Sequence, residues 1–186
     1  KVEKGTLVAT PTGLGANIFS SVYGTVEEVT DQAIVIQPDD EQPDRYIPIK
    51  KSDSKLEMVK EAGIVGMGGA GFPTAVKLAP KNMDEIDRLV INAAECEPYI
   101  TSDNRCMLED TQHILSGIEA VMKYLEIPQC VIGIEQNKPK AIAHMKEAVV
   151  GKPIEIKELP CSYPQGAEKV LIENCTGREV PFPGLP

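Results

Sequence analysis

Residues 63–78, with the sequence GIVGMGGAGFPTAVKL, have the composition of a loop that binds phosphate. Gly66, Gly68 and Gly71 form the pattern G-x-G-x-x-G. A glycine-rich turn that leads into a helix exposes backbone N–H groups, and the helix dipole adds about half a positive charge behind them. Thr74 would add a hydroxyl group, and Lys77 would add an ammonium group one turn later.

The same stretch has a second interpretation, as a bend in which glycine permits close packing of two helices. The usual dinucleotide-binding fingerprint follows a strand, whereas residues 51–62 have the composition of a helix. Pro73 suits the first position of the next helix. The loop by itself therefore leaves both a phosphate site and a packing bend open.

Polar side chains follow two of the predicted strands. Asn92, Glu95 and Glu97 come after one strand, and Glu135 ends the next. Ligands of open α/β sheets bind beyond the carboxyl ends of the strands. Carboxylates repel phosphate there, but they accept hydrogen bonds from ribose hydroxyls and from the N–H edge of a heterocycle. A single acid in such a place is usually solvated or caps a helix, whereas two such runs at one edge favour a binding site.

Glu168 shares a helical stripe with Leu171, Ile172 and Cys175, so the periodicity predicts that its carboxylate points inward. A buried carboxylate is costly unless it is paired or hydrogen-bonded. The N-terminus of its own helix would offset part of that cost, and a bound cofactor would offset more. A capping contact and a ligand contact both remain open.

No other pattern predicts catalysis or metal binding. The two histidines, His113 and His144, belong to no metal-ligand pattern, and the five cysteines include no C-x-x-C pair. There is no G-x-S-x-G, H-E-x-x-H or Walker sequence. We therefore expect no metal site and no catalytic side chain, and we expect reduced, mostly buried cysteines in an intracellular protein.

The composition narrows the class of partner. The net charge of −9 on 186 residues argues against binding to nucleic acid or to an anionic membrane surface. No apolar run approaches the roughly 18 residues of a membrane span, and no signal peptide opens the chain. Because the chain starts with Lys1 and ends in PFPGLP, we expect it to be part of a longer protein.

Two regions are expected to position these groups. Residues 1–50 contain short β-rich segments and predict a small all-β module, which resembles the barrel-sandwich hybrids of biotinyl and lipoyl carriers but lacks their lysine. Residues 51–186 predict an α/β domain, with a mostly parallel sheet and helices on both faces. The expected strands are 6–10, 20–30, 32–38, 45–49, 87–94, 129–135 and 153–159, and the expected helices are 51–62, one from Pro73, 110–125, 137–149 with Asn137 as its cap, and 165–177 with Gly177 as its stop.

The sequence contains, in this order, GIVGMGGAGFPTAVKL, VINAAECEPYITSDNR, GIEQNKP and YPQGAEKVLIENCTGREVP. Together these segments resemble the C subunit of the Rnf complex, a ferredoxin:NAD oxidoreductase. The glycine segment is also similar to that of the flavin-binding subunit of respiratory complex I. The resemblance covers nearly all of this chain but only the front part of the family chain. It implies that 4Fe-4S clusters lie beyond residue 186 of the parent protein.

This resemblance implies a site for FMN and NADH. In complex I relatives the glycine loop lies against the nucleotide, and the lysine that matches Lys77 helps to hold phosphate. The residue that matches Asn92 contacts the flavin, and the acids that match Glu95 and Glu97 lie by the flavin and the nicotinamide nucleotide. With Glu135 from the strand-end argument, the expected cofactor-binding residues are Gly66, Gly68, Gly69, Gly71, Phe72, Thr74, Lys77, Asn92, Glu95, Glu97, Glu135, Gly166 and Glu168.

Two departures from the family limit this transfer. Ala94 stands where complex I relatives carry an aspartate, so one flavin contact is not expected here. Further contacts to the FMN phosphate come from sequence beyond residue 186, so the chain alone is expected to bind FMN weakly or not at all.

The resemblance implies an NADH-dependent electron-transfer oxidoreductase subunit that passes electrons between NAD(H), flavin and iron–sulfur clusters. Its expected partners are the other subunits of a membrane-bound redox complex and, indirectly, ferredoxin. Its expected place is the cytoplasmic side of the bacterial cell membrane. A cobalamin reductase-type flavoprotein and a non-catalytic docking module of a redox complex remain as alternatives.

Overall fold

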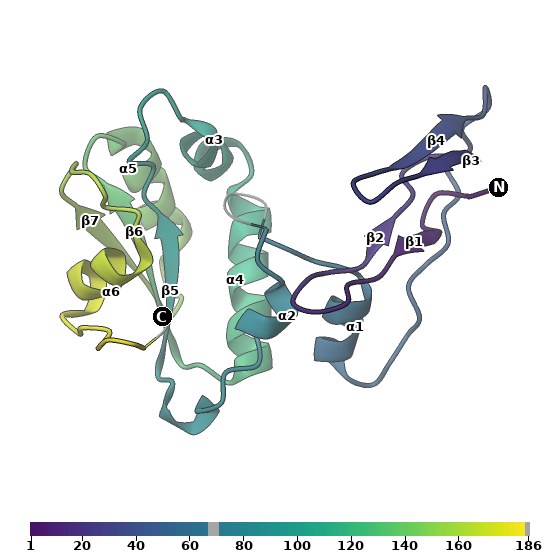
Figure 1. The fold of residues 1–186 in the computed structure, drawn as a ribbon. Coiled ribbons are helices and arrows are strands. Elements are labelled where there is room, and N and C mark those ends of the chain that lie inside the picture. Colours follow the sequence, from purple (N-terminus) through teal and green to yellow (C-terminus); the bar gives the residue numbers. More distant parts are fainter. Residues whose placement is uncertain (67–70, 185–186) are drawn as a thin grey trace. The chain divides into compact units, whose positions relative to one another are not determined.

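The computed structural model describes residues 1–66 and 71–184, and its ribbon is drawn in Figure 1. The chain forms two compact units, Lys1–Lys81 and Asn82–Pro186. Residues 51–81 belong to the first unit. One contact between this stretch and the N-terminal part is the hydrogen bond that Asn17 Nδ2 donates to the carbonyl oxygen of Glu61 at 3.2 Å. That residues 51–186 form one functional domain stays a prediction.

The first unit begins with two small antiparallel sheets. β1 (Leu7–Ala9) pairs with β2 (Ile18–Phe19), and β3 (Gly24–Val29) pairs with β4 (Ile34–Pro38). The prediction of a small all-β module at the N-terminus is thereby confirmed. The predicted strand at 45–49 was wrong: these residues form no ladder. Proline at position 48 has no N–H to donate to a ladder, and within this segment only the Ile47 N–H bonds across, to the Lys4 carbonyl.

A short helix, α1 (Lys55–Glu61), leads into the glycine-rich segment. The Ser54 side chain caps α1 by accepting a hydrogen bond from the Glu57 N–H. Gly63 follows with φ +66°, and a Cβ at this position would stand 2.2 Å from the Asn17 carbonyl oxygen. Glycine is therefore required here by both conformation and space. The predicted helix after Pro73 is a single turn, α2 (Thr74–Lys77).

The second unit contains a parallel sheet in the order β5–β6–β7, as the sequence predicts. Its strands are β5 (Arg88–Ala93), β6 (Gln129–Glu135) and β7 (Ile154–Leu159), and a 3₁₀ turn, η1 (Met83–Glu85), precedes them. Ala93 pairs with Ile134, and Glu135 pairs with Leu159. The carboxyl ends of all three strands therefore meet at one edge of the sheet.

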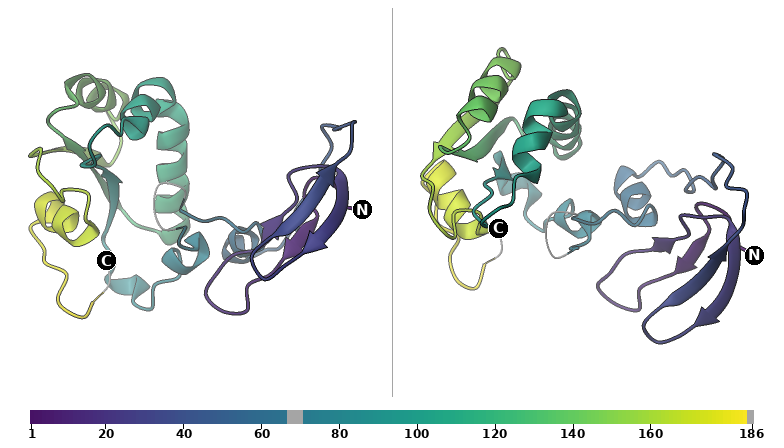
Figure 2. Two further views of the ribbon diagram at one scale, coloured as in Figure 1. Left: turned by 45° about the horizontal axis from the view of Figure 1, so that its top comes forward. Right: turned by 90° about the horizontal axis from the view of Figure 1, so that it is seen from above.

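Helices cover both faces of this sheet, which confirms the predicted α/β class (Figure 2). α4 (Thr111–Leu125) and α5 (Pro139–Ala148) pack on one face, together with Met107 of α3 (Ser102–Glu109). α6 (Glu168–Thr176) packs on the other face through Leu171 and Cys175, and it ends at Gly177 with φ +71°, as predicted.

Side chains alternate between these two faces along β6. Ile132 and Ile134 belong to the larger core beneath α3, α4 and α5, while Val131 belongs to the core beneath α6. Gly133 also faces α6, where a Cβ would lie 2.8 Å from the Cys175 sulfur. Glycine at this position therefore lets α6 approach the sheet closely. Among the described residues, no helix is both long and apolar enough to cross a membrane.

The cysteines differ in environment, and the expectation that most are buried was wrong. Cys130 and Cys175 are buried, whereas Cys106 and Cys161 are exposed and Cys96 is half-buried. The exposed cysteines lie on a polar helix and in a loop, where no core is available to cover them. Burial raises the pKa of the Cys130 thiol to about 12, and burial also raises the pKa of Cys175.

We predict that a thiol reagent such as DTNB labels Cys106 and Cys161 rapidly in the folded protein and leaves Cys130 and Cys175 unlabelled. A pKa of about 12 in place of 9.0 makes the Cys130 thiolate about a thousandfold rarer. Raising the pH from 7 to 9 should therefore accelerate labelling only at the accessible positions. Mass spectrometry of quenched samples identifies the sites, and a Cys106→Ser/Cys161→Ser variant should lack the fast phase. Fast modification of Cys130 in folded protein would contradict this assignment.

Candidate functional site

A cavity of about 370 Å³ lies at the carboxyl ends of the strands in the second unit, and we call it the strand-end cavity. Glu95 and Glu97 line it from the loop after β5, Glu135 from the end of β6, Lys138 from the start of α5, and Tyr163 from the loop after β7. Its volume falls within the range of about 300–1,000 Å³ that is typical of small-molecule sites. The acids that follow β5 and end β6 thus come together at one edge, as the sequence predicts.

Glu135 is the most unusual group in this cavity. The residue is only 1% exposed, and neither carboxylate oxygen has a hydrogen-bond partner among the described residues. Burying a carboxylate without donors costs folding free energy, because its hydration is lost and nothing replaces it. An orphaned acceptor pair that lines a cavity is the arrangement expected where a ligand supplies the donors.

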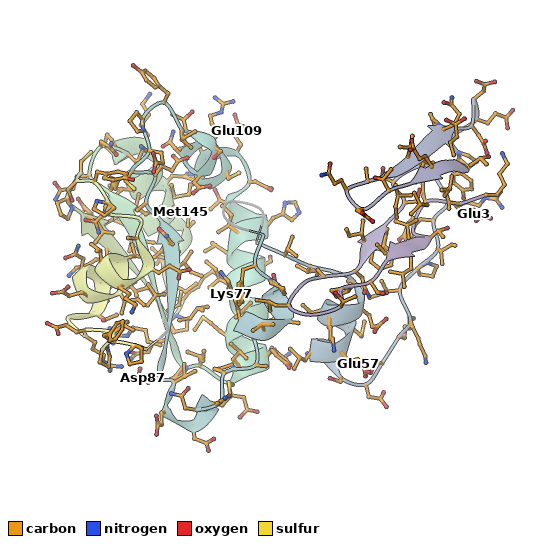
Figure 3. The ribbon with its side chains drawn as sticks, in the orientation of Figure 1. Glu3, Glu57, Lys77, Asp87, Glu109 and Met145 are labelled. Carbon is orange, nitrogen blue, oxygen red and sulfur yellow. The ribbon has the colours of Figure 1, made fainter. Side chains whose placement is uncertain are left out.

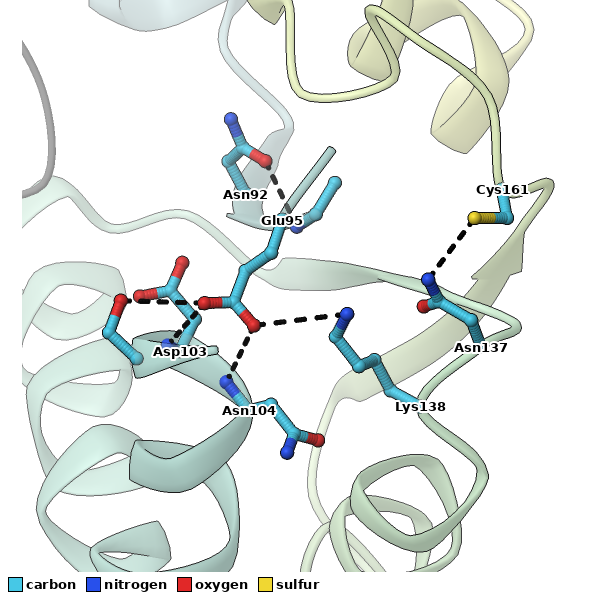
Figure 4. Close-up of polar contacts among 9 residues, drawn as sticks. Asn92, Glu95, Asp103, Asn104, Asn137, Lys138 and Cys161 are labelled. Carbon is cyan, nitrogen blue, oxygen red and sulfur yellow. Dashed lines mark hydrogen bonds and ion pairs between the residues drawn. The ribbon is translucent and has the colours of Figure 1, made fainter. Parts of the chain in front are cut away.

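Glu95 lines the same cavity but has a different role. Its side chain is 2% exposed, and its two oxygens accept hydrogen bonds from the Asp103 N–H at 2.7 Å and the Asn104 N–H at 3.0 Å (Figure 4). The Ser102 hydroxyl donates to it at 3.4 Å. Because α3 begins at Ser102, Glu95 caps the N-terminus of this helix from a remote position. Its oxygens are therefore engaged by the protein itself.

Lys138 places a positive charge beside Glu95, with its Nζ 4.0 Å from a Glu95 oxygen and its side chain 12% exposed. Asp103 is close to the same carboxylate, and its pKa is raised mainly by burial and also by the charge of Glu95. Sequence reasoning missed Lys138, although a lysine that stands three residues after a strand-end acid and directly before a helix-opening proline was the available signal. The neighbouring Asn137 was wrongly predicted to cap α5; it donates instead to the Cys161 sulfur at 3.1 Å.

Asn92 of β5 and Gly166 of the loop before α6 lie far apart in the sequence but are in contact in the second unit. Asn92 Nδ2 donates to the Gly166 carbonyl at 2.9 Å, and the Gly166 N–H donates to the Cys96 sulfur at 3.4 Å. A Cβ on Gly166 would stand 3.2 Å from the Ala94 carbonyl oxygen. Glycine therefore lets the loop before α6 lie directly against the segment after β5. Both residues were expected on resemblance, but their contact was not.

The two remaining acids of the expected set are exposed. Glu97 lines the strand-end cavity from the solvent side. Glu168 was expected to point inward, and the structure corrects this: it is an exposed residue. The helical stripe is real for Leu171 and Cys175, which are buried against the sheet. Glu168, however, is the first residue of α6 and lies one turn ahead of the part that packs.

The glycine-rich loop belongs to the first unit, where Lys77 ends α2 (Figure 3). The Gly66 N–H donates to the Phe72 carbonyl at 3.0 Å, so the described ends of the loop are paired with each other. Gly71 has φ +65°, which favours glycine. The Lys77 ammonium lies 5.8 Å from the centroid of the Phe72 ring, a cation–π distance. Gly68 and Gly69 lie outside the described residues.

These contacts bear on the two interpretations of the loop. The Thr74 N–H donates to the Ile64 carbonyl at 2.9 Å, so it joins the Gly66 N–H in closing the loop. α2 has only four residues, which leaves little helix dipole behind its start. Two described backbone N–H groups of this loop, those of Gly66 and Thr74, are therefore engaged within the chain, and a phosphate site here stays a prediction.

Tyr99 is a second residue of the strand-end cavity that sequence reasoning missed. It is fully exposed and has φ +66°, a conformation that is unfavourable for a bulky residue. Such strain recurs at ligand sites, where the surrounding structure maintains it. No sequence signal distinguishes it, because the backbone conformation of a single tyrosine is not readable from its neighbours.

A wider depression of about 660 Å³ in the first unit is a weaker candidate. It is lined by Tyr23, Asp39 and Arg45 among others. Lys1 pairs with the lining residue Asp39 at 2.7 Å, and Gln42 donates hydrogen bonds to the backbone carbonyls of Tyr23 and Asp39. Unlike the strand-end cavity, it contains no buried side-chain atom without a partner among the described residues.

Comparisons with known proteins point to one family. The profile of the Nuo51 FMN-binding domain matches residues 59–186. The chain is 45% identical over its whole length to the C subunit of the proton-translocating ferredoxin:NAD(+) oxidoreductase complex of Clostridium ljungdahlii. It is 43% identical over 85% of its length to the C subunit of the ion-translocating oxidoreductase complex of Vibrio cholerae.

A solved structure of similar fold is an NAD⁺-reducing [NiFe]-hydrogenase in its air-oxidised state. It matches 69% of this chain and 25% of its own, with a TM-score of 0.55 and 27% identity. The chain spans 44% of the Clostridium relative and 21% of the Vibrio relative, so it corresponds to only part of those proteins.

We predict that Glu95→Gln destabilises the protein by about 1–3 kcal/mol, because an amide accepts at only one of the two atoms that now accept α3 N–H bonds. Urea denaturation followed by circular dichroism measures the loss. Glu97→Gln removes the same charge from an exposed position nearby and should change the free energy of unfolding by less than about 0.5 kcal/mol. Equal stabilities of the two variants would rule out the capping role.

Proposed function

Because the chain belongs to the Nuo51 FMN-binding domain family, we propose that it forms the FMN- and NADH-binding part of an electron-transfer oxidoreductase. The observation that supports this best is Glu135, a buried carboxylate with no partner among the described residues, in a cavity at the carboxyl ends of a parallel sheet. This is where α/β proteins bind nucleotides.

The residues of the strand-end cavity suit the sugar and ring portions of such cofactors better than their phosphates. Glu97 and Glu135 are hydrogen-bond acceptors, and Tyr99 presents an exposed aromatic ring. The positive charge of Lys138 lies beside Glu95, with its Nζ 4.0 Å from a Glu95 oxygen. On the first unit, considered by itself, the predicted phosphate-binding groups are Lys77 and Thr74, with the glycines of the loop before them.

FMN, when bound, exchanges two electrons with NADH and single electrons with iron–sulfur clusters, which is why it suits the junction between the two kinds of carrier. The part of this chain is to bind and orient the reacting rings. Asn92 fixes the Gly166 loop, Glu95 fixes the start of α3, and the acids of the cavity hold the ligand. No side chain of the chain is required as a nucleophile or a general base.

We further propose that the parent protein works as one subunit of a membrane-bound redox complex on the cytoplasmic side of a bacterial membrane. The support is the similarity to the C subunits of complexes named as ferredoxin:NAD(+) and ion-translocating oxidoreductases. Its electrons would then pass between NAD(H) and ferredoxin by way of clusters in sequence beyond residue 186. The other subunits of the complex would be its partners.

The first test is an anaerobic titration of the chain with FMN, followed by flavin fluorescence, and then addition of NADH. We expect flavin binding, and bleaching of the flavin absorbance when NADH is added. If the 186-residue chain binds no flavin, the titration is repeated on a version that extends past Pro186. Failure of both versions to bind would contradict the proposal and favour a docking module.

We predict that Lys77→Ala in the extended version weakens FMN binding at least about tenfold, the effect of about 1.4 kcal/mol lost from a phosphate contact. Lys81→Ala removes an exposed lysine four residues further on and should leave flavin affinity unchanged. Unchanged flavin occupancy and NADH oxidation in both Lys77→Ala and Glu97→Gln would rule out the proposed binding residues.

A further inference from the structure

The buried side-chain atoms that lack a partner among the described residues are the two Glu135 oxygens and Gln165 Nε2. Gln165 already accepts hydrogen bonds from Asn174 at 3.3 Å and Ser162 at 3.4 Å through its oxygen, and it does not line the strand-end cavity. Glu135 is a lining residue of the cavity, and both of its carboxylate oxygens lack a partner among the described residues. Of the two residues, only Glu135 is placed to meet a ligand.

The surroundings of Glu135 define what kind of ligand suits it. Two charged residues of the cavity, Glu95 and Lys138, lie close to each other, with the Lys138 Nζ 4.0 Å from a Glu95 oxygen. The ion pair that the structure gives Lys138 is therefore with Glu95 and not with Glu135. Among the described residues no group of three or more acids, cysteines or histidines is arranged to hold a metal ion. Hydrogen-bond donors of an organic ligand would supply the missing partners, and two donors are needed because both oxygens are unpartnered.

We infer that Glu135 binds a vicinal diol, with one hydroxyl of the pair donating to each of its carboxylate oxygens. This inference rests on the proposed function, because FMN and NADH both carry adjacent hydroxyl groups and neither carries an ammonium group. The amide and ring N–H groups of the same cofactors are also hydrogen-bond donors. They do not, however, form a pair of hydroxyl groups on neighbouring carbon atoms. The diol has three sources: the adenosine ribose and the nicotinamide ribose of NADH, and the ribityl chain of the flavin.

If the diol belongs to the adenosine ribose, Glu135 also determines the choice of nucleotide. NADP(H) carries a phosphate in place of the 2′-hydroxyl, which removes one donor and places negative charge against a buried carboxylate. A site built to bond a hydroxyl rejects an analogue that leaves its buried polar group unpaired. The chain would therefore prefer NAD(H) to NADP(H).

A ligand-binding carboxylate of this kind has a second signature, in the absence of ligand. Glu135→Gln keeps the shape of the side chain and removes the buried charge, so the ligand-free protein should melt higher, by about 2–4 °C for each kcal/mol of buried-charge cost removed. A carboxylate that served the fold would behave in the opposite way, because its replacement would lower the melting temperature.

The experiment compares wild type, Glu135→Gln, Glu135→Asp and Glu155→Gln in the version that extends past Pro186. Glu155 is an exposed residue of β7 and provides the control for loss of one charge. Calorimetric titrations use two matched pairs of probes. The first pair is ADP-ribose and 2′-phospho-ADP-ribose, and the second pair is riboflavin and lumiflavin, which lacks the ribityl chain. Thermal melts of the ligand-free proteins are recorded in parallel.

For a ribose diol we expect Glu135→Gln to lose at least tenfold in ADP-ribose affinity. For the adenosine ribose in particular, wild type should also bind ADP-ribose at least tenfold more tightly than its 2′-phosphate. For a ribityl diol we expect Glu135→Gln to lose at least tenfold for riboflavin and nothing for lumiflavin. In either case Glu135→Gln melts higher than wild type. Glu135→Asp retracts the charge, so it should lose affinity without that gain, and Glu155→Gln should match wild type.

The inference is overturned if wild type binds these probes and Glu135→Gln binds them equally well. It is also overturned if Glu135→Gln lowers the melting temperature or fails to fold, since the carboxylate would then serve the structure. A wild type that binds neither ADP-ribose nor any flavin overturns the proposed function itself, and this result is distinct from the other two.

Discussion

The in-register parallel pairing of β5, β6 and β7 is the constraint on which the rest of the second unit depends. Ala93 opposite Ile134 and Glu135 opposite Leu159 place the ends of all three strands at one edge. Three loops must therefore begin side by side, and an acid lies at or near the end of two of these strands: Glu135 ends β6, and Glu95 follows β5 by two residues. One of these acids, Glu95, contacts α3 and Lys138, whereas the other, Glu135, has no side-chain partner among the described residues.

Glu95 shows how a residue can resemble a ligand contact and yet act through the fold. Its carboxylate accepts hydrogen bonds from two N–H groups in the first turn of α3. This turn comes immediately after residues 98–101, which line the cavity. Substitution at Glu95 would therefore alter the shape of the cavity without removing a contact to the ligand. Its effect on binding would be indirect, and it would be accompanied by a loss of stability.

Much of the fold could be predicted because strong local signals agree with the tertiary structure. The buried strand 129–135 and the stop at Gly177 are two such cases. α3 was missed because its residues are polar and only Met107 is buried, so it has no apolar stripe to read. Glu168 was misplaced because periodicity gives the direction of a side chain and not the point where the helix leaves the sheet.

The strand-end cavity illustrates the same limit for a site. Its acids could be located from the sequence, since a strand followed by acids is a local pattern, whereas the division of labour between Glu95 and Glu135 depends on contacts across the fold. Two features of this cavity, an unpartnered buried carboxylate and a tyrosine at φ +66°, are unfavourable for the ligand-free chain. Selection for stability alone would remove both, because Gln for Glu135 and Gly for Tyr99 relieve them at once. Their presence together in one cavity is explained if the gain in free energy comes from a bound ligand.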